Sequence, residues 1–168
     1  MMREEKRTMS KIEETARNWL KERGVTIEDI AELVYYLQVK YHPNLQMEEC
    51  IHNVDRVIAK REVQNAILTG IQLDKLAENG MLDEPLQTTI KSDEGLYGVD
   101  EILALSIVNI YGSIGFTNYG YIDKEKPGIL KCLNDKTNGK CHTFLDDLVG
   151  AIAAAASSRL AHRTANTE

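Results

Sequence analysis

The segment 144–162 is predicted to be a helix whose middle, residues 151–156, consists of one isoleucine and five alanines. A helix that is apolar on every side packs among other helices rather than on a surface. Two adjacent carboxylates, Asp146 and Asp147, stand at its start. Because desolvated carboxylates are costly unless they are paired, these two need partners, and a divalent cation is one partner that satisfies both.

Apolar residues recur at helical spacing along nearly the whole chain, and Thr26 with Asp29 forms a predicted capping box. Because a continuous β-branched alternation is missing, we predict no sheet. The expected fold is a single all-α domain over residues 1–168, a compact multi-helical bundle of about seven helices. Helices are expected up to Gly24, from Thr26 to His42, and at about 47–59, 61–78, 84–91, 100–111, 129–134 and 144–162, with turns over 112–128.

Composition narrows the class of protein. A formal net charge of −6 over 168 residues argues against nucleic acid as the main partner. No stretch reaches the roughly 18 apolar residues of a membrane span, and the charged N-terminal residues do not resemble a signal peptide. We therefore expect a soluble, cytoplasmic protein with no transmembrane segment, and its largely apolar helices favour a homo-oligomer. Three cysteines without zinc-ligand spacing are expected to be buried free thiols.

A second pair of acids, Asp100 and Glu101, opens another apolar stretch. Each pair lies where a loop meets an apolar helix, which suggests a metal site shared with Asp146 and Asp147. The alternative interpretation is structural. Thr143 and Asp146 would form a capping box, Asp100 would be an N-cap, and the remaining acids would favour the positive end of a helix dipole.

Two further sets of residues could belong to a functional site or could be ordinary surface residues. Asp123 and Lys126 lie in the charged segment 121–127, which is either a solvated turn or part of a site. In the site, Asp123 is a ligand or base and Lys126 meets a phosphate as a point charge. Four more titratable residues share one face of a predicted helix, for which a solvent-exposed face is favoured over a metal site: Glu48, Glu49, His52 and Asp55.

Three segments, taken in order, resemble the phosphatidylglycerophosphatase A family: Val99-Asp100-Glu101, the Asp-x-x-Lys-Pro pattern of 123–127, and the Leu-Asp-Asp-Leu-Val-Gly of 145–150. More closely, the chain is similar to the short soluble bacterial branch of that family, sometimes called low-temperature requirement C proteins. The resemblance covers residues 98–155. It implies a compact all-helical fold and a magnesium-dependent activity that removes the terminal phosphate of phosphatidylglycerol phosphate to give phosphatidylglycerol.

The resemblance also implies roles for individual residues. We expect a metal-dependent phosphomonoester hydrolase with Mg²⁺ as cofactor, Mn²⁺ or another divalent cation being the alternative. Asp123 is the expected general base, and Lys126 is expected to stabilise charge on the phosphoryl oxygens. The expected metal ligands are Asp100, Glu101, Asp146 and Asp147.

Other functions stay open beside this one. Enzymes of the family are membrane proteins, whereas this chain has no predicted span. A phosphatase acting on a water-soluble phosphomonoester is therefore one alternative, and an enzyme peripheral to the membrane, acting on a phospholipid headgroup, is another. A third is a non-catalytic helical protein in which a metal only ties the bundle together. Pure caps predict little effect of a cation on melting temperature, and a metal site predicts stabilisation.

Overall fold

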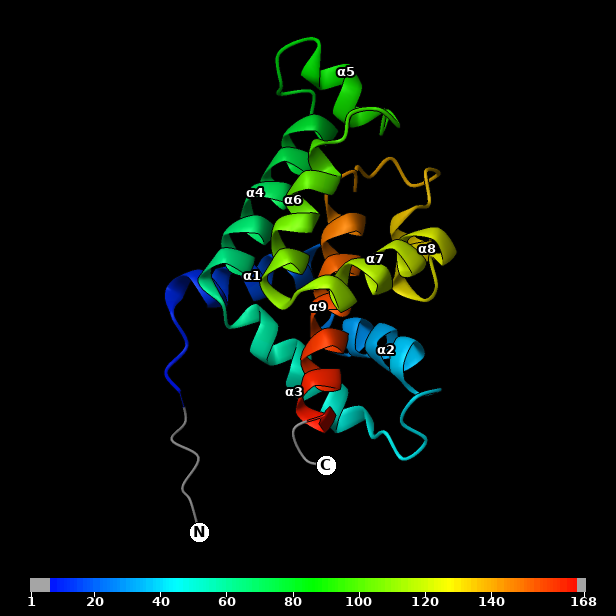
Figure 1. Cartoon of the computed structure of the whole chain (residues 1–168). Coiled ribbons are helices and arrows are strands. Elements are labelled where there is room, and N and C mark those ends of the chain that lie inside the picture. Colours follow the sequence, from blue (N-terminus) through cyan, green and yellow to red (C-terminus); the bar gives the residue numbers. More distant parts are fainter. Residues whose placement is uncertain (1–6, 166–168) are drawn as a thin grey trace.

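The computed structural model describes residues 7–165, which form nine α-helices and one 3-10 helix and contain no strand (Figure 1). This confirms the predicted all-α fold without a sheet, with more helices than expected because several are short. The elements are α1 Lys11–Glu22, α2 Ile27–Gln38, α3 Met47–Ile58, α4 Arg61–Glu78, α5 Leu86–Lys91, α6 Val99–Val108, η1 Asn109–Tyr111, α7 Ser113–Glu125, α8 Ile129–Leu133 and α9 Leu145–Ala165.

The last helix, α9, runs through the middle of the molecule and contacts α2, α3, α4, α6, α7 and α8 (Figure 1). All residues from 145 to 158 are buried, as the apolar sequence predicts. Small side chains allow the surrounding helices to approach closely. At Gly70 of α4, a Cβ would clash with the Leu148 side chain and would lie 3.0 Å from the Cβ of Phe144. An alanine at position 70 would force Leu148 to shift, so Gly70 allows α4 to cross close to the start of α9.

Local signals fix the boundaries of the first four helices. The Oγ of Ser10 accepts a hydrogen bond from the Glu13 amide at 3.2 Å and caps α1. Thr26 and Asp29 form the predicted capping box of α2, with N···O distances of 3.1 and 2.9 Å. Lys60 is extended, with φ −83° and ψ 135°, so α3 and α4 are separate helices.

The segment 112–128 contradicts the predicted turns, because 13 of its residues form α7. The sequence predicts turn residues at the glycines of this segment, but Gly115 lies where neighbouring side chains pack closely against the helix. A Cβ on it would lie 2.9 Å from Val108 Cγ1 and 3.2 Å from Ser158 Oγ. The chain turns at the two ends of α7, at Gly112 with φ 83° and at Lys126 with φ 49°, the latter just before Pro127.

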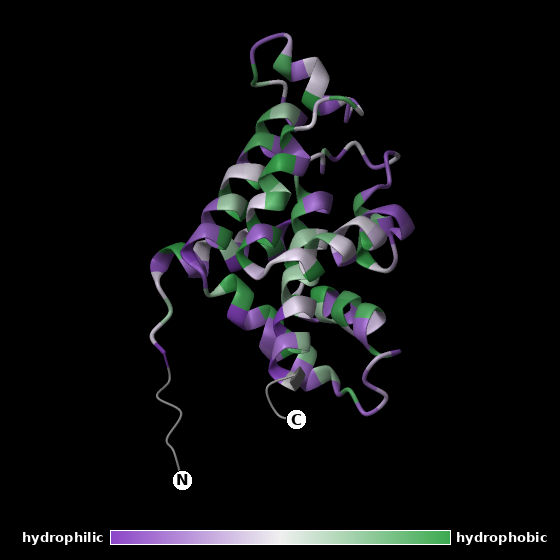
Figure 2. Ribbon diagram, in the orientation of Figure 1, coloured by the Kyte–Doolittle hydropathy of each residue, from purple (hydrophilic) through white to green (hydrophobic). Residues whose placement is uncertain are grey.

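Figure 2 shows hydrophilic residues on the outer sides of the helices and along much of the loop between α8 and α9. None of the described helices combines the length and apolar character that crossing a bilayer requires. All three cysteines are free; Cys50 and Cys141 are buried as predicted, whereas Cys132 is exposed.

Candidate functional site

The ends of three helices bring most of the predicted acids together (Figure 1). Asp100 lies in the first turn of α6, Asp123 in the last turn of α7, and Asp146 with Asp147 in the first turn of α9. Asp100, Asp146 and Asp147 are only 9, 7 and 6 % exposed. The charges of the other three carboxylates all raise the pKa of Asp147, so the four groups are within electrostatic reach of one another.

The adjacent aspartates are strongly perturbed. Burial raises the pKa of Asp147, and the charges of Asp146 and Asp100 and a hydrogen bond with the Asp100 carboxyl raise it further. Burial also raises the pKa of Asp146, although the nearby ammonium of Lys126 lowers it. These effects favour the protonated form of Asp147 when no cation neutralises the cluster.

Lys126 is the cation that meets these acids. Its Nζ donates to Asp123 Oδ1 at 2.7 Å and to Asp146 Oδ2 at 3.5 Å. Burial alone would lower the pKa of Lys126, but the hydrogen bond to Asp123 and the charges of Asp146, Asp123 and Asp147 raise it. The ammonium stays protonated and bridges the end of α7 to the start of α9.

Asp74 of α4, which sequence reasoning missed, holds the start of α9. It is fully buried, and its Oδ1 and Oδ2 each accept a backbone N–H at 2.9 Å, from Phe144 and Leu145 respectively. The predicted local capping box does not form, because the Thr143 hydroxyl donates to the carbonyl of Ile90 at 2.6 Å. A residue about seventy positions upstream thus fixes the first turn that carries the two site aspartates.

The loop before α9 is anchored by an ion pair. Arg23 binds Glu78 at 2.9 Å and donates to the Cys141 carbonyl at 2.8 Å. Burial alone would raise the pKa of Glu78, but its hydrogen bonds to Arg23 and the Cys141 amide lower the value to about 2. His142 lies beside Arg23, and burial together with that charge lowers its pKa to about 4. This histidine is neutral at pH 7 and belongs to the anchor.

Tyr119 is a second residue that the sequence did not single out. It is 7 % exposed, and its hydroxyl is buried without a hydrogen-bond partner among the described residues. Burial raises its pKa, as do the charges of Asp147 and Asp123. Its ring lies 3.7 Å from the position that a Cβ on Gly150 would take. The phenol is therefore a buried proton donor at the edge of the acid cluster.

Glu101, the remaining predicted ligand, is exposed on α6. Within residues 7–165, no group of three or more His, Cys, Asp or Glu side chains is arranged to hold a metal ion. The donor chemistry nevertheless suits a hard divalent cation, because the gathered ligands are all carboxylate oxygens. Burial and the charges of Asp146 and Asp100 raise the pKa of Asp147, and a cation bound among these carboxylates would relieve that repulsion.

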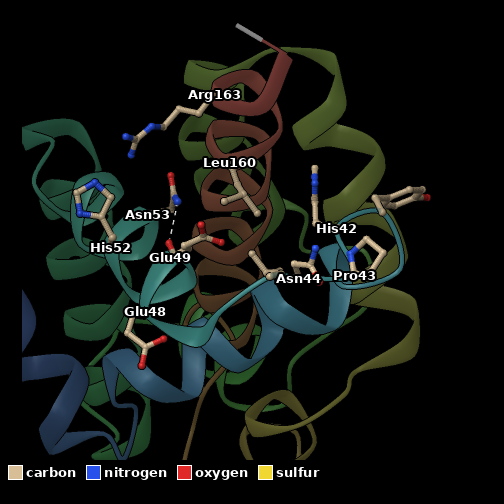
Figure 3. A pocket seen from close by; sticks show the side chains of 11 residues that line it. His42, Pro43, Asn44, Glu48, Glu49, His52, Asn53, Leu160 and Arg163 are labelled. Carbon is tan, nitrogen blue, oxygen red and sulfur yellow. Dashed lines mark hydrogen bonds between the residues drawn. The ribbon is translucent and has the colours of Figure 1, made fainter. Parts of the chain in front are cut away.

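A cavity of about 660 Å³ lies elsewhere, between α3 and the last turns of α9 (Figure 3). Glu48, Glu49 and His52 line it, but they do not converge: the Glu48 side chain points away from His52. Glu49 accepts the amide at the start of α3 at 3.4 Å, and Asp55 pairs with Arg17 at 2.6 Å. The helix face that these acids share is therefore occupied by structural contacts.

Comparison with known proteins extends the likeness beyond the three motifs. The family model described as Phosphatidylglycerophosphatase A matches residues 17–162. The uncharacterized protein YutG of Bacillus subtilis is 71% identical over 164 residues, which cover 98% of this chain and 99% of YutG. Two solved structures are also similar. The low temperature requirement C protein from Listeria monocytogenes is 68% identical, with a TM-score of 0.93 over 94% of this chain and 99% of that one. A protein of unknown function from Bacillus stearothermophilus is 82% identical, with a TM-score of 0.90 over 92% of this chain and 96% of that one.

Proposed function

Because the chain belongs to the phosphatidylglycerophosphatase A family, we propose that it is a metal-dependent phosphomonoester hydrolase. The observation that carries the proposal is the cluster of nearly buried carboxylates at the start of α9, bridged by one lysine. A purely structural protein gains little from this arrangement, since burying several like charges is costly. A site that binds a cation and a phosphate gains the ligands it needs.

The proposed cofactor is Mg²⁺, with Mn²⁺ as the alternative, held by Asp100, Glu101, Asp146 and Asp147. Such an ion supplies charge neutralisation for the phosphomonoester and an activated water. Support comes from Asp147, whose pKa is raised by burial and by the charges of Asp146 and Asp100, so that positive charge near it would be stabilising. Glu101 contributes from the exposed rim of α6.

The chain's own groups perform the remaining steps in this proposal. Asp123, 2.7 Å from the ammonium of Lys126, takes a proton from the attacking water as general base. Lys126 turns from Asp146 toward the phosphoryl oxygens and stabilises their charge. The buried hydroxyl of Tyr119, which has no hydrogen-bond partner within residues 7–165, offers one further donor.

The proposed substrate is the phosphomonoester of phosphatidylglycerol phosphate, which the family name suggests. In this case the protein is cytoplasmic and reaches the headgroup from the membrane surface. A water-soluble phosphomonoester is the second candidate, which the absence of a bilayer-crossing helix among the described residues favours. The two substrates differ in what lies beyond the phosphate, and both require the same acid cluster.

A non-catalytic role is the competing proposal. It is favoured by one observation: no three described His, Cys, Asp or Glu side chains are yet arranged around a single ion position. In that role a cation would bind Asp100 and Asp147 and tie α6 to α9. Metal would then raise the stability without any turnover of phosphate.

We also propose that the chain forms a homo-oligomer. Several apolar residues of α6, η1 and α7 and of the turn before α6 are exposed to solvent. They are Leu96, Val99, Ile102, Ile110, Ile114 and Phe116. Sedimentation equilibrium tests this directly: a monomer at all concentrations would contradict it.

The experiment that tests the function is phosphate release by the metal-stripped protein after Mg²⁺ or Mn²⁺ is restored. Phosphatidylglycerol phosphate in detergent is compared with a panel of soluble phosphomonoesters. Asp147→Asn should abolish release, whereas Asp83→Asn, the same change at an exposed position outside the cluster, should leave it intact. Release that survives in Asp147→Asn refutes the site. Cation-dependent stabilisation without release from any substrate supports the non-catalytic role.

A further inference from the structure

A second pocket, lined mainly by polar residues, lies toward the C-terminal end of α9, away from the acid cluster. It has a volume of about 430 Å³ and is separated from Asp147 by about 18 Å of helix, at about 1.5 Å per residue. Four of its six lining residues are cationic. The lining residues are Arg7, Arg56, Ala59, Lys60, Tyr111 and Arg159. Such a concentration of positive charge is unexpected on a chain whose net charge is −6.

Three of the four cations of this pocket form no ion pair with a carboxylate among residues 7–165. Within residues 7–165, no carboxylate forms an ion pair with Arg56, Lys60 or Arg159, whereas Arg7 pairs with Glu13. Arg159 donates at 2.6 Å to the neutral amide oxygen of Asn53. Burial lowers the pKa of Arg159, as do other nearby guanidinium groups. Among the described residues, Glu13 pairs with Arg7 and the charge of Glu62 reaches Tyr111, but Arg56, Lys60 and Arg159 are held together without a paired carboxylate.

Tyr111 provides an independent observation. Its hydroxyl is buried and has no hydrogen-bond partner among the described residues. Burial raises its pKa, and the charges of Arg159 and Arg56 oppose that rise, which places both guanidinium groups near the phenol. Lys60 lies 5.8 Å from the centre of its ring. The hydroxyl stays protonated at neutral pH and is available as a donor to an acceptor in the pocket.

A structural role accounts for only part of this arrangement. Arg56 is in the last turn of α3 and Arg159 is near the end of α9, where cations favour the negative ends of the helix dipoles. That effect requires neither a pocket nor a buried donor. Lys60 follows the C-cap of α3 and is also the N-cap of α4, so the two helix dipoles act on it in opposite directions.

We propose that this pocket binds a phosphate-bearing anion, at a site separate from the acid cluster. The two guanidinium groups of Arg56 and Arg159 bind phosphate oxygens through directional N–H donors, Lys60 adds a point charge, and Tyr111 donates its hydroxyl. The shared chemistry is a phosphate group of high charge, carried by a free metabolite or by a lipid headgroup. The proposal does not depend on whether the acid cluster hydrolyses anything.

The test is calorimetric titration of the metal-stripped protein with pyrophosphate at constant ionic strength. One saturable site per chain is expected, with affinity about tenfold weaker in Arg56→Gln. Arg56 is exposed and forms no ion pair with a described residue, so folding should not depend on it. Arg61→Gln is the matched control, because Arg61 is exposed on the next helix and does not line the pocket. Tyr111→Phe should also weaken binding.

Three outcomes would overturn the proposal: no saturable binding, an equal loss in Arg61→Gln, or a loss in Lys126→Gln that matches the loss in Arg56→Gln. The last would mean that pyrophosphate binds at the acid cluster. Flotation with vesicles distinguishes the two sources of phosphate. Arg56-dependent binding to vesicles that contain phosphatidic acid, and not to pure phosphatidylcholine, assigns the pocket to a headgroup. Pyrophosphate binding without vesicle binding assigns it to a free metabolite.

Discussion

The residue on which the acid cluster most depends is Asp74, and the substitution Asp74→Asn isolates its role. The carboxyl is fully buried and accepts the amides of Phe144 and Leu145, each at 2.9 Å. Asparagine has nearly the same shape but replaces one acceptor oxygen with an NH₂ group. One of the two amides then faces a donor instead of an acceptor.

The expected cost follows from this geometry. A buried donor that loses its partner costs about 1–3 kcal/mol, and the orphaned amide belongs to the first turn of the central helix. We therefore expect Asp74→Asn to lower the free energy of unfolding by about 2 kcal/mol at pH 6. Asp74→Ala removes both acceptors and leaves a cavity, so its cost should be larger, about 3–5 kcal/mol.

The cost should also depend on pH. Burial raises the pKa of Asp74 to about 8, although the two amides and Arg23 lower it. Since an unfolded aspartate has a pKa of about 3.9, the folded state retains a proton that the unfolded state has released. The wild-type protein therefore loses stability as the pH rises from about 4 to 8. Asp74→Asn has no such proton, so the difference between the two proteins should shrink by pH 9.

Urea denaturation at pH 6 and pH 9, followed by far-ultraviolet circular dichroism, measures both effects. Asp83→Asn is the control, because Asp83 is exposed and its side chain contacts no described residue through a hydrogen bond or ion pair. Its stability should stay within about 0.5 kcal/mol of the wild type. A cost for Asp74→Asn below that limit, or one that grows with pH, would refute this account of how α9 is held.

Three further predictions concern packing, a buried hydroxyl and acid stability. Gly70→Ala should lower the free energy of unfolding by about 1–3 kcal/mol, because the new methyl group clashes with Leu148. Gly120→Ala, at a helical position with nothing within 4 Å of the new Cβ, should raise it by up to about 1 kcal/mol. Urea denaturation measures both changes. Tyr119→Phe should leave the melting temperature unchanged or raise it, since its hydroxyl lacks a partner among the described residues. Glu78, with its pKa lowered to about 2, stabilises the fold above a pH of about 4.3, and this contribution is lost as the pH falls toward 2. Acid titration of Glu78→Gln should therefore show a flatter profile.

The sequence predicted those parts of the fold that local chemistry decides. Thr26 and Asp29 are three residues apart, and no distant group competes for their partners, so the capping box of α2 forms as expected. The bounds of α4 were also predicted correctly. The run of alanines in α9 correctly indicated a helix surrounded on all sides, because no other environment suits so apolar a segment.

Distant contacts account for the errors. Gly115 was expected in a turn, but it lies in α7, at a position where Val108 and Ser158 leave no room for a Cβ. Thr143 was a good local cap for α9, yet its hydroxyl binds the Ile90 carbonyl. Asp74 instead accepts the amides at the helix start. The residues next to Asp74 in the sequence do not indicate this role. A pattern along the chain cannot indicate which of two competing partners is nearer in the folded protein.

Asp74 occupies amides that would otherwise stabilise the acids of α9. The positive end of a helix normally stabilises nearby carboxylates through its free amides, but the amides of Phe144 and Leu145 are already bound by Asp74. Asp146 and Asp147 therefore share the helix start with a third carboxylate, and the Asp147 amide lowers the pKa of Asp146 only in part. Lys126 offsets one charge among them. In the proposed metal site, either protons or a bound cation neutralise the remaining negative charge. Because the two compete for the same carboxylates, we expect the affinity for Mg²⁺ to rise with pH.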